Sequence, residues 1–214
     1  LGFIYSISYT TAAVTLFMLA LMPFLASVIA FIFLKEKISK QNFVSMVVAF
    51  IGTLVMIYAS AFSGSFFGLI MGFISSLGFA AFSVALRSKS DIKKFYILIY
   101  GGLFCALFSA FLMIINNQDF YIPIKNVYLS MTHGTLVASG LILFSIGSKQ
   151  LLSGELTMLS LLEVVGGIFW AWLPILGINE VPSINTIIGG AIICVAIAMN
   201  SYRFDKKRLR NLTR

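Results

Sequence analysis

The sequence predicts an all-α integral membrane protein, a multi-span helical bundle, and three observations support this prediction. Hydrophobic residues make up 60% of the 214 residues and charged residues only 10%, whereas soluble domains carry about 25% charged residues. Apolar runs long enough to cross a bilayer as single helices recur along the chain. The polar segments between these runs are too short to form a soluble domain. A water-soluble fold and a disordered chain are therefore both excluded.

Seven apolar runs have the length that a membrane-spanning helix needs, about 20 residues. They cover residues 12–34, 43–60, 66–86, 95–115, 127–147, 156–176 and 184–202. Residues 1–9 form a further apolar stub, which we interpret as the end of one more span. Because a span cannot begin halfway through a membrane, we expect the chain to be the C-terminal part of a longer protein.

Lys and Arg residues lie almost entirely on one side of the membrane if the predicted spans alternate in direction. Fourteen of the fifteen bases fall on one face, and only Lys125 falls on the other. Basic residues in short loops mark the cytoplasmic side. That face, with the C-terminal tail, is therefore predicted to be cytoplasmic, in a bacterial inner membrane or a plasma membrane. The basic tail is interpreted as an orientation anchor, with anionic lipid or a protein partner as the alternative, and no nucleic acid is expected.

Two stretches of the chain share one plan, a helical hairpin with a glutamate at its turn. Glu36 precedes a helix that carries Gly52, and Glu180 precedes a helix that carries Gly189. The charge distribution places the two glutamates on opposite faces of the membrane. The two copies are therefore predicted to be inverted relative to each other, an arrangement typical of secondary transporters.

The repeat also predicts how the chain is divided. Residues 1–60 form the C-terminal part of a first repeat, residues 66–202 form a complete second repeat of five spans, and residues 203–214 form a basic cytoplasmic tail. Repeats of equal length predict a parent protein of ten spans, of which this chain holds seven and a stub. Because part of the pocket wall is then missing, we expect this chain to be inactive by itself.

Short motifs recur in a fixed order along nearly the whole chain. They are Tyr9-Thr10-Thr11-Ala12-Ala13, Met22-Pro23, Leu34-Lys35-Glu36-Lys37, Gly68 with Phe79-Ala80 and Leu86-Arg87, Gly154-Glu155, Leu161-Leu162-Glu163, Trp170-Ala171-Trp172-Leu173 and Asn179-Glu180-Val181-Pro182-Ser183. In this order and spacing they resemble the EamA-type permeases of the drug/metabolite transporter superfamily. The resemblance implies ten helices in two inverted halves and transport of small organic solutes, often outward.

Two positions depart from the pattern of that family. Val164 stands where the second repeat of the family often has a proline after the Leu-Leu-Glu motif. The stretch from Trp172 to Glu180 is also longer than usual, which displaces Pro174. We therefore expect the outer end of this helix to differ from that of its relatives.

Glu163 is the acidic residue that lies well inside a predicted span, about 12 Å from its cytoplasmic end at about 1.5 Å per residue. A carboxylate buried in a membrane is costly unless it is protonated or paired, and such residues usually face the bundle interior. No Lys or Arg lies within a predicted span to pair with it. Two interpretations stay open: a site for a proton or an amine-bearing solute, and a structural carboxyl that hydrogen-bonds a neighbouring helix.

Three further pocket candidates lie in the run over residues 127–147. His133 is the single histidine of the chain, and it serves either a solute or proton site or a structural hydrogen bond. A metal site is not expected, because no second ligand stands at a suitable spacing. Thr135 and Ser139 share one helix face, where their hydroxyls either line a polar pocket or bond the carbonyl one turn back.

Ser160 and Trp170 lie in the same run as Glu163 and complete the set of pocket candidates. Trp170 comes late in its helix, so an interfacial aromatic belt explains it as well as stacking on a solute does. Gly166 and Gly167 stand between these residues and are expected to weaken the helix.

Prolines are expected to bend two of the predicted spans. Pro174 lies near the end of the run that carries Glu163, and Pro23 lies near the middle of the first complete run. A proline removes one backbone hydrogen bond from a helix and so kinks it. Bent or broken helices often form the solute sites of transporters near mid-membrane.

Small residues recur every four positions along the run over residues 66–86 and just before it. They are Gly64, Gly68, Gly72, Ser76 and Ala80. Such a stripe lets two helix backbones approach closely. Helix packing is one interpretation, and a sliding face during transport is the other.

These features favour a secondary transporter that moves a small organic solute by alternating access, with export as the expected direction and protons as the candidate coupling ion. The bilayer and the solute are the expected partners, no cofactor is expected, and the oligomeric state is not predicted. One alternative is a non-transporting membrane scaffold or subunit. An intramembrane enzyme fits less well, because the sequence shows no nucleophile with a base and no phosphate-binding loop.

Overall fold

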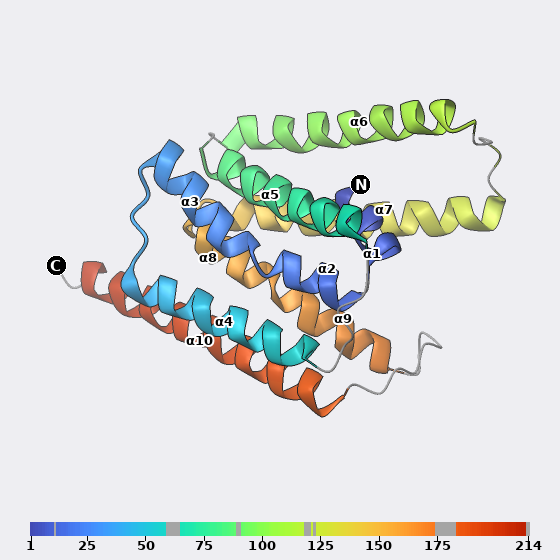
Figure 1. The fold of residues 1–214 in the computed structure, drawn as a ribbon. Helices are drawn as coiled ribbons and strands as arrows, with labels where there is room; N and C mark the ends of the chain where they lie inside the picture. Colours follow the sequence, from blue (N-terminus) through green and yellow to red (C-terminus); the bar gives the residue numbers. More distant parts are fainter. Residues whose placement is uncertain are drawn as a thin grey trace. The chain divides into compact units, whose positions relative to one another are not determined.

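The computed structural model describes residues 1–10, 12–58, 65–88, 91–117, 121, 123–173 and 183–212. The regular elements of this part are α-helices (Figure 1). They are α1 (Gly2–Tyr9), α2 (Ala12–Leu19), α3 (Met22–Leu34), α4 (Lys40–Ile57), α5 (Phe66–Ser88), α6 (Asp91–Ile115), α7 (Ile124–Gly147), α8 (Ser153–Ser160), α9 (Leu162–Trp172) and α10 (Ile184–Leu212). The predicted all-α fold is confirmed.

Five helical segments of the described part are long and apolar enough to cross a membrane. They are Val14–Leu34, Phe66–Ser88, Phe95–Ile115, Ile124–Gly147 and Ile184–Tyr202. Of the other two predicted spans, one is the shorter apolar helix Lys40–Met56, and the other is divided between α8 and α9. The multi-span membrane bundle agrees with the prediction, and the count of seven spans stays a prediction.

The helices form two compact units. The first comprises Leu1–Val84 and Leu152–Arg214, and the second comprises Ala85–Leu151. In the second unit α6 and α7 are neighbours along the chain and in space (Figure 1). Arg87 links the beginning of this unit to its end. Its guanidinium Nη1 donates to the backbone oxygens of Ser148 and Lys149 at 3.2 and 2.7 Å, just after α7 ends.

The first unit is built around the antiparallel pair α4 and α10, which lie side by side (Figure 1). Gly52 and Gly189 meet where the two helices cross. A Cβ on Gly52 would lie 2.9 Å from the Gly189 oxygen, and a Cβ on Gly189 would contact the Gly52 oxygen. At one end of the pair the Gln41 side chain donates to the Met199 oxygen at 2.6 Å. Glycine at the crossing therefore permits direct backbone contact, as in many membrane helix pairs.

A core of apolar side chains joins this pair to α3, α8 and α9. Its buried members are Met22, Met46, Ala49, Met56, Met158, Leu161, Val164, Ile193, Ala196 and Ile197. Methionine is frequent among them, and its flexible thioether fills irregular spaces between helices. The first unit is therefore one packed body rather than a loose group of spans.

Helices α3 and α8 pack on each other through small side chains. A Cβ on Gly154 of α8 would contact Ser27 Oγ of α3 and would lie 2.8 Å from Met46 Cε of α4. Ser27 is itself buried, and its hydroxyl donates to Met46 Sδ at 3.7 Å. The glycine is therefore required by packing at the point where three helices meet.

Gly154→Ala is expected to lower the free energy of unfolding by about 1–3 kcal/mol, because the added methyl overpacks this point. Alanine is otherwise favoured over glycine in a helix. Ser27→Ala, which removes the hydroxyl that the methyl meets, is expected to restore at least half of the loss. Thermal unfolding in detergent of both single variants and the double variant measures the coupling. Strict additivity of the two substitutions would contradict this account of the contact.

Candidate functional site

The first complete apolar run is broken at Ala20 and Leu21, and the break separates α2 from α3. Pro23 causes it, since a proline has no N–H to give to the carbonyl of Leu19 and its ring disfavours the preceding turn. The Leu21 N–H instead bonds the Met18 oxygen at 3.1 Å, which tightens the last turn of α2. Local sequence therefore accounts for the position of this break, and the role of Pro23 in transport stays a prediction.

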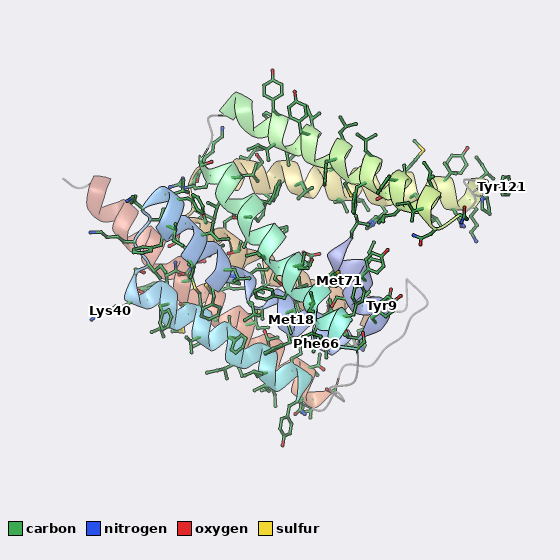
Figure 2. All side chains as sticks on the ribbon, turned by 45° about the horizontal axis from the view of Figure 1, so that its top comes forward. Tyr9, Met18, Lys40, Phe66, Met71 and Tyr121 are labelled. Carbon is green, nitrogen blue, oxygen red and sulfur yellow. The ribbon has the colours of Figure 1, made fainter. Side chains whose placement is uncertain are left out.

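The exposed backbone at this break is hydrogen-bonded by a serine from another helix. Ser76 Oγ of α5 donates to the Met18 oxygen at 2.6 Å and is 3.1 Å from the Gly72 oxygen. Figure 2 labels Met18 on α2 and Met71 on α5, and a Cβ on Gly72, the residue after Met71, would be 2.9 Å from Met18 Cγ. A serine hydroxyl of this kind satisfies backbone groups that a broken helix leaves free in a membrane.

Ser76→Ala is expected to lower the free energy of unfolding by about 0.5–1.5 kcal/mol, because it removes this hydrogen bond from the half-buried carbonyl of Met18. Thermal unfolding in detergent measures the change. Ser139→Ala is the matched control, since the Ser139 side chain is exposed and its hydroxyl donates to the Thr135 oxygen of its own helix. An equal loss in both variants would show that the contact at the break has no special role.

Gly68 and Gly72 of the small-residue stripe also lie against the end of α1 and against α2. A Cβ on Gly68 would contact Thr10 Cγ2, and a Cβ on Gly72 would lie 2.7 Å from Ser6 Oγ. Ser6 Oγ in turn lies 3.0 Å from Thr15 Oγ1. Close helix packing therefore accounts for these positions, while Gly64 lies outside the described residues.

The run that carries Glu163 is also broken, at Leu161. The Leu161 N–H bonds the Met158 oxygen, and the Val164 N–H bonds the Leu161 oxygen, each at 3.1 Å. Helix α9 then continues through Gly166 and Gly167 to Trp172. The helix is therefore interrupted before the two glycines, and the bend expected at Gly166 and Gly167 stays a prediction. Pro174 lies outside the described residues.

Glu163 lies in the first turn of α9, directly after this break. The sequence interpretation treats it as a buried carboxylate, but within the described part its side chain is exposed. The N-terminal N–H groups of a helix carry partial positive charge and favour a nearby anion. The surroundings of Glu163 are therefore set by a helix start and an open side rather than by complete burial.

The other candidates of this run are less informative. Ser160 is the last residue of α8, half-buried, with its hydroxyl 3.4 Å from the Leu156 oxygen. Trp170 belongs to α9, and its side chain lies outside the described part. Neither is shown in contact with Glu163.

His133, Thr135 and Ser139 lie on α7 in the second unit, and all three side chains are exposed. The Thr135 hydroxyl bonds the Met131 oxygen at 2.8 Å, and the Ser139 hydroxyl bonds the Thr135 oxygen at 2.8 Å. These are the bonds to the preceding turn that the sequence left open as the alternative to a pocket. The described residues include no group of three or more His, Cys, Asp or Glu side chains that could hold a metal ion.

Glu36 makes a contact that the sequence did not reveal. Its Oε2 accepts a hydrogen bond at 3.3 Å from the backbone N–H of Ser153, the first residue of α8. The sequence placed this glutamate at the turn of a helical hairpin, between Lys35 and Lys37, and indicated no partner for it. A link between residues so far apart in the chain has no local sequence signal.

One segment of the chain matches a known protein family. Residues 1–58 match the EamA-like transporter family. This segment of the chain is EamA-like. The resemblance read from the motifs is confirmed, and with it a multi-pass membrane protein that transports a small solute. The second repeat, residues 66–202, stays a prediction.

Curated relatives agree with this family. Pseudopaline exporter CntI from Pseudomonas aeruginosa strain PAO1 is 26% identical over 200 residues, which cover 91% of this chain and 67% of the exporter. The protein of the same name from strain UCBPP-PA14 matches to the same extent. A solved crystal structure with 18% sequence identity aligns with a TM-score of 0.68, covering 96% of this chain and 72% of that chain. This structural likeness supports the fold alone.

Proposed function

We propose that the protein exports a small organic solute by alternating access, with Glu163 at the break between α8 and α9 as the polar contact for the solute or a coupling proton. The observation that supports this most directly is the pair of broken helices in the first unit, α2–α3 and α8–α9. Broken helices whose free backbone ends lie near the middle of the membrane are the usual building blocks of transporter sites.

The two breaks occupy equivalent positions in the proposed inverted repeats. Each broken helix is followed by a helix with a glycine, and those two glycines, Gly52 and Gly189, contact each other reciprocally. Where a twofold axis passes between two copies, equivalent residues contact each other in this way. This reciprocity supports inverted repeats, and rocking of one repeat against the other supplies the alternation.

The proposed direction of transport rests on the relatives, and the proposed solute class rests on the charged residues of the predicted spans. Both curated relatives are named as exporters of pseudopaline, so export is the proposed direction and pseudopaline is a solute to test. Glu163 contributes one negative charge, and the predicted spans hold no Lys or Arg. Zwitterionic or amine-bearing solutes therefore fit better than polyanionic ones. The proposed location is a bacterial inner membrane with a cytoplasmic C-terminus, since the bases gather on one face.

The test uses the natural gene product in proteoliposomes loaded with pseudopaline and with mixtures of amino acids, amines and nucleosides. Mass spectrometry of the external medium follows each compound over time. We expect selective efflux of one class, saturable and dependent on the protein. Unselective efflux would indicate a pore, and full retention of every class would favour the scaffold alternative.

A further inference from the structure

We propose that Glu36 is the gate residue of this protein: its carboxylate holds the turn after α3 to the first backbone N–H of α8, and this contact must break for α3 and α8 to separate during transport. The inference rests on the proposed function, because it assigns a residue to one step of alternating access. It concerns one end of the first unit, away from the breaks described above.

The backbone conformation of the turn after α3 orients Glu36 toward α8. Lys35 adopts the left-handed conformation, with φ 58°, directly after α3. The N–H groups of Lys35 and Glu36 both bond the Ala30 oxygen, the latter at 3.3 Å. Glu36 is half-buried, whereas Lys35 and Lys37 are exposed. A non-glycine residue in this conformation is costly, so the turn is held by its surroundings, and it aims Glu36 at α8.

Two carboxylates bond the N-terminus of α8, Glu155 from within the start of this helix and Glu36 from the turn after α3. Glu155 Oε2 accepts from the Leu152 N–H at 3.1 Å, a bond within the start of α8 itself. Glu36 Oε2 accepts from the Ser153 N–H. Helix N-termini leave such N–H groups without intrahelical partners, and a carboxylate there is favoured by hydrogen bonding and by the helix dipole. When α8 moves away from α3, the Glu155 bond travels with α8 and the Glu36 bond breaks.

The interface beneath this contact is suited to separation. Ser27 of α3 meets Gly154 of α8, and Ser153 and Thr157 of α8 are fully buried. The Thr157 hydroxyl donates to the Ser153 oxygen at 2.9 Å, while Ser153 Oγ has no hydrogen-bond partner within the described part. An unpaired buried hydroxyl opposes the closed state, because it regains hydrogen bonds when water enters. The charge-assisted bond of Glu36 therefore adds to the packing of α3 on α8 in the closed state.

The test measures access to this interface without relying on transport. Ser27→Cys is introduced into the natural gene product with Cys105→Ser and Cys194→Ser, which remove the two exposed native cysteines. Proteoliposomes are labelled with a membrane-impermeant maleimide from each side in turn. We expect Glu36→Ala to raise the labelling rate of residue 27 from one side by about tenfold, which corresponds to about 1.4 kcal/mol. Glu36→Gln, which keeps the acceptor oxygen and loses the charge, is expected to give a smaller increase.

Glu155→Ala is the matched control, because it removes a carboxylate from the same helix start and leaves the bond between Ser153 and Glu36 in place. We expect it to lower thermal stability and leave the labelling rate unchanged. If the Glu36→Ala variant is not monodisperse in detergent, the labelling rate is measured with Glu36→Gln instead. If residue 27 is labelled no faster in the folded Glu36 variants than in the protein with Glu36, Glu36 is not a gate residue. This conclusion holds even if solute efflux is normal. Faster labelling in a protein that moves no solute would instead contradict the proposed function and leave the contact as a conformational switch.

Discussion

Gly189→Ala is expected to lower the free energy of unfolding by about 3 kcal/mol or more, because the added methyl meets backbone atoms and not flexible side-chain ends. It would contact the Gly52 oxygen and lie 2.7 Å from the Met56 nitrogen. Neither atom can move unless α4 and α10 separate, and this pair is the centre of the first unit. Thermal unfolding in detergent and the monodisperse fraction after size-exclusion chromatography measure the effect.

The neighbouring residue supplies the control. A Cβ on Gly190 would meet Met56 Cε at 3.8 Å and Val165 Cγ1 at 3.9 Å, which are ordinary contacts. Gly190→Ala is therefore expected to be neutral or slightly stabilising, since alanine favours the helix by about 1 kcal/mol. If the two variants lose stability equally, the backbone contact between Gly52 and Gly189 is not what holds the pair together.

The two glycines also show how far the sequence could predict this fold. Gly52 and Gly189 could be matched from their places in the repeat, because each follows a hairpin turn with a glutamate. Their mutual contact could not be predicted, since apolar faces of membrane helices are alike and do not select a partner. The helices themselves were predictable because hydrophobic length is a local property.

The two helix breaks also differ in how well the sequence predicts them. The break before Pro23 follows from a local rule, the missing proline N–H. The break at Leu161 has no such signal, because leucine is a good helix former, and the glycines that suggested a bend lie further along, inside α9. Non-local packing must therefore determine where α8 ends.

Site residues were harder to predict than the fold. The position of Glu163 inside an apolar run is visible in the sequence, whereas its exposure depends on which face of α9 the neighbouring helices leave open. The hydrogen bond from Ser153 to Glu36 joins segments that only the tertiary structure brings together. The sequence alone shows where the titratable residues stand in the chain. Their hydrogen-bond partners can be identified only in the packed structure.

Glu163→Gln is expected to reduce solute efflux at least about tenfold, because it removes the charge at the start of α9 and with it a charge-assisted contact worth about 1.5–3 kcal/mol. The measurement is initial efflux from proteoliposomes over a range of pH. Glu163→Asp keeps the charge on a shorter side chain and is expected to retain most of the activity. Comparing the two variants separates the effect of removing the negative charge from the effect of changing the side-chain shape.

The same variant distinguishes the two roles left open for this carboxylate. A neutral glutamine resembles the protonated acid, so a proton-coupling role predicts that Glu163→Gln loses transport driven by a pH gradient and keeps solute exchange at equal pH. A solute-binding role predicts that both are lost and that the KM for exchange rises. Normal efflux by Glu163→Gln at every pH would exclude both roles, and the carboxyl would then be a structural group at the first turn of α9.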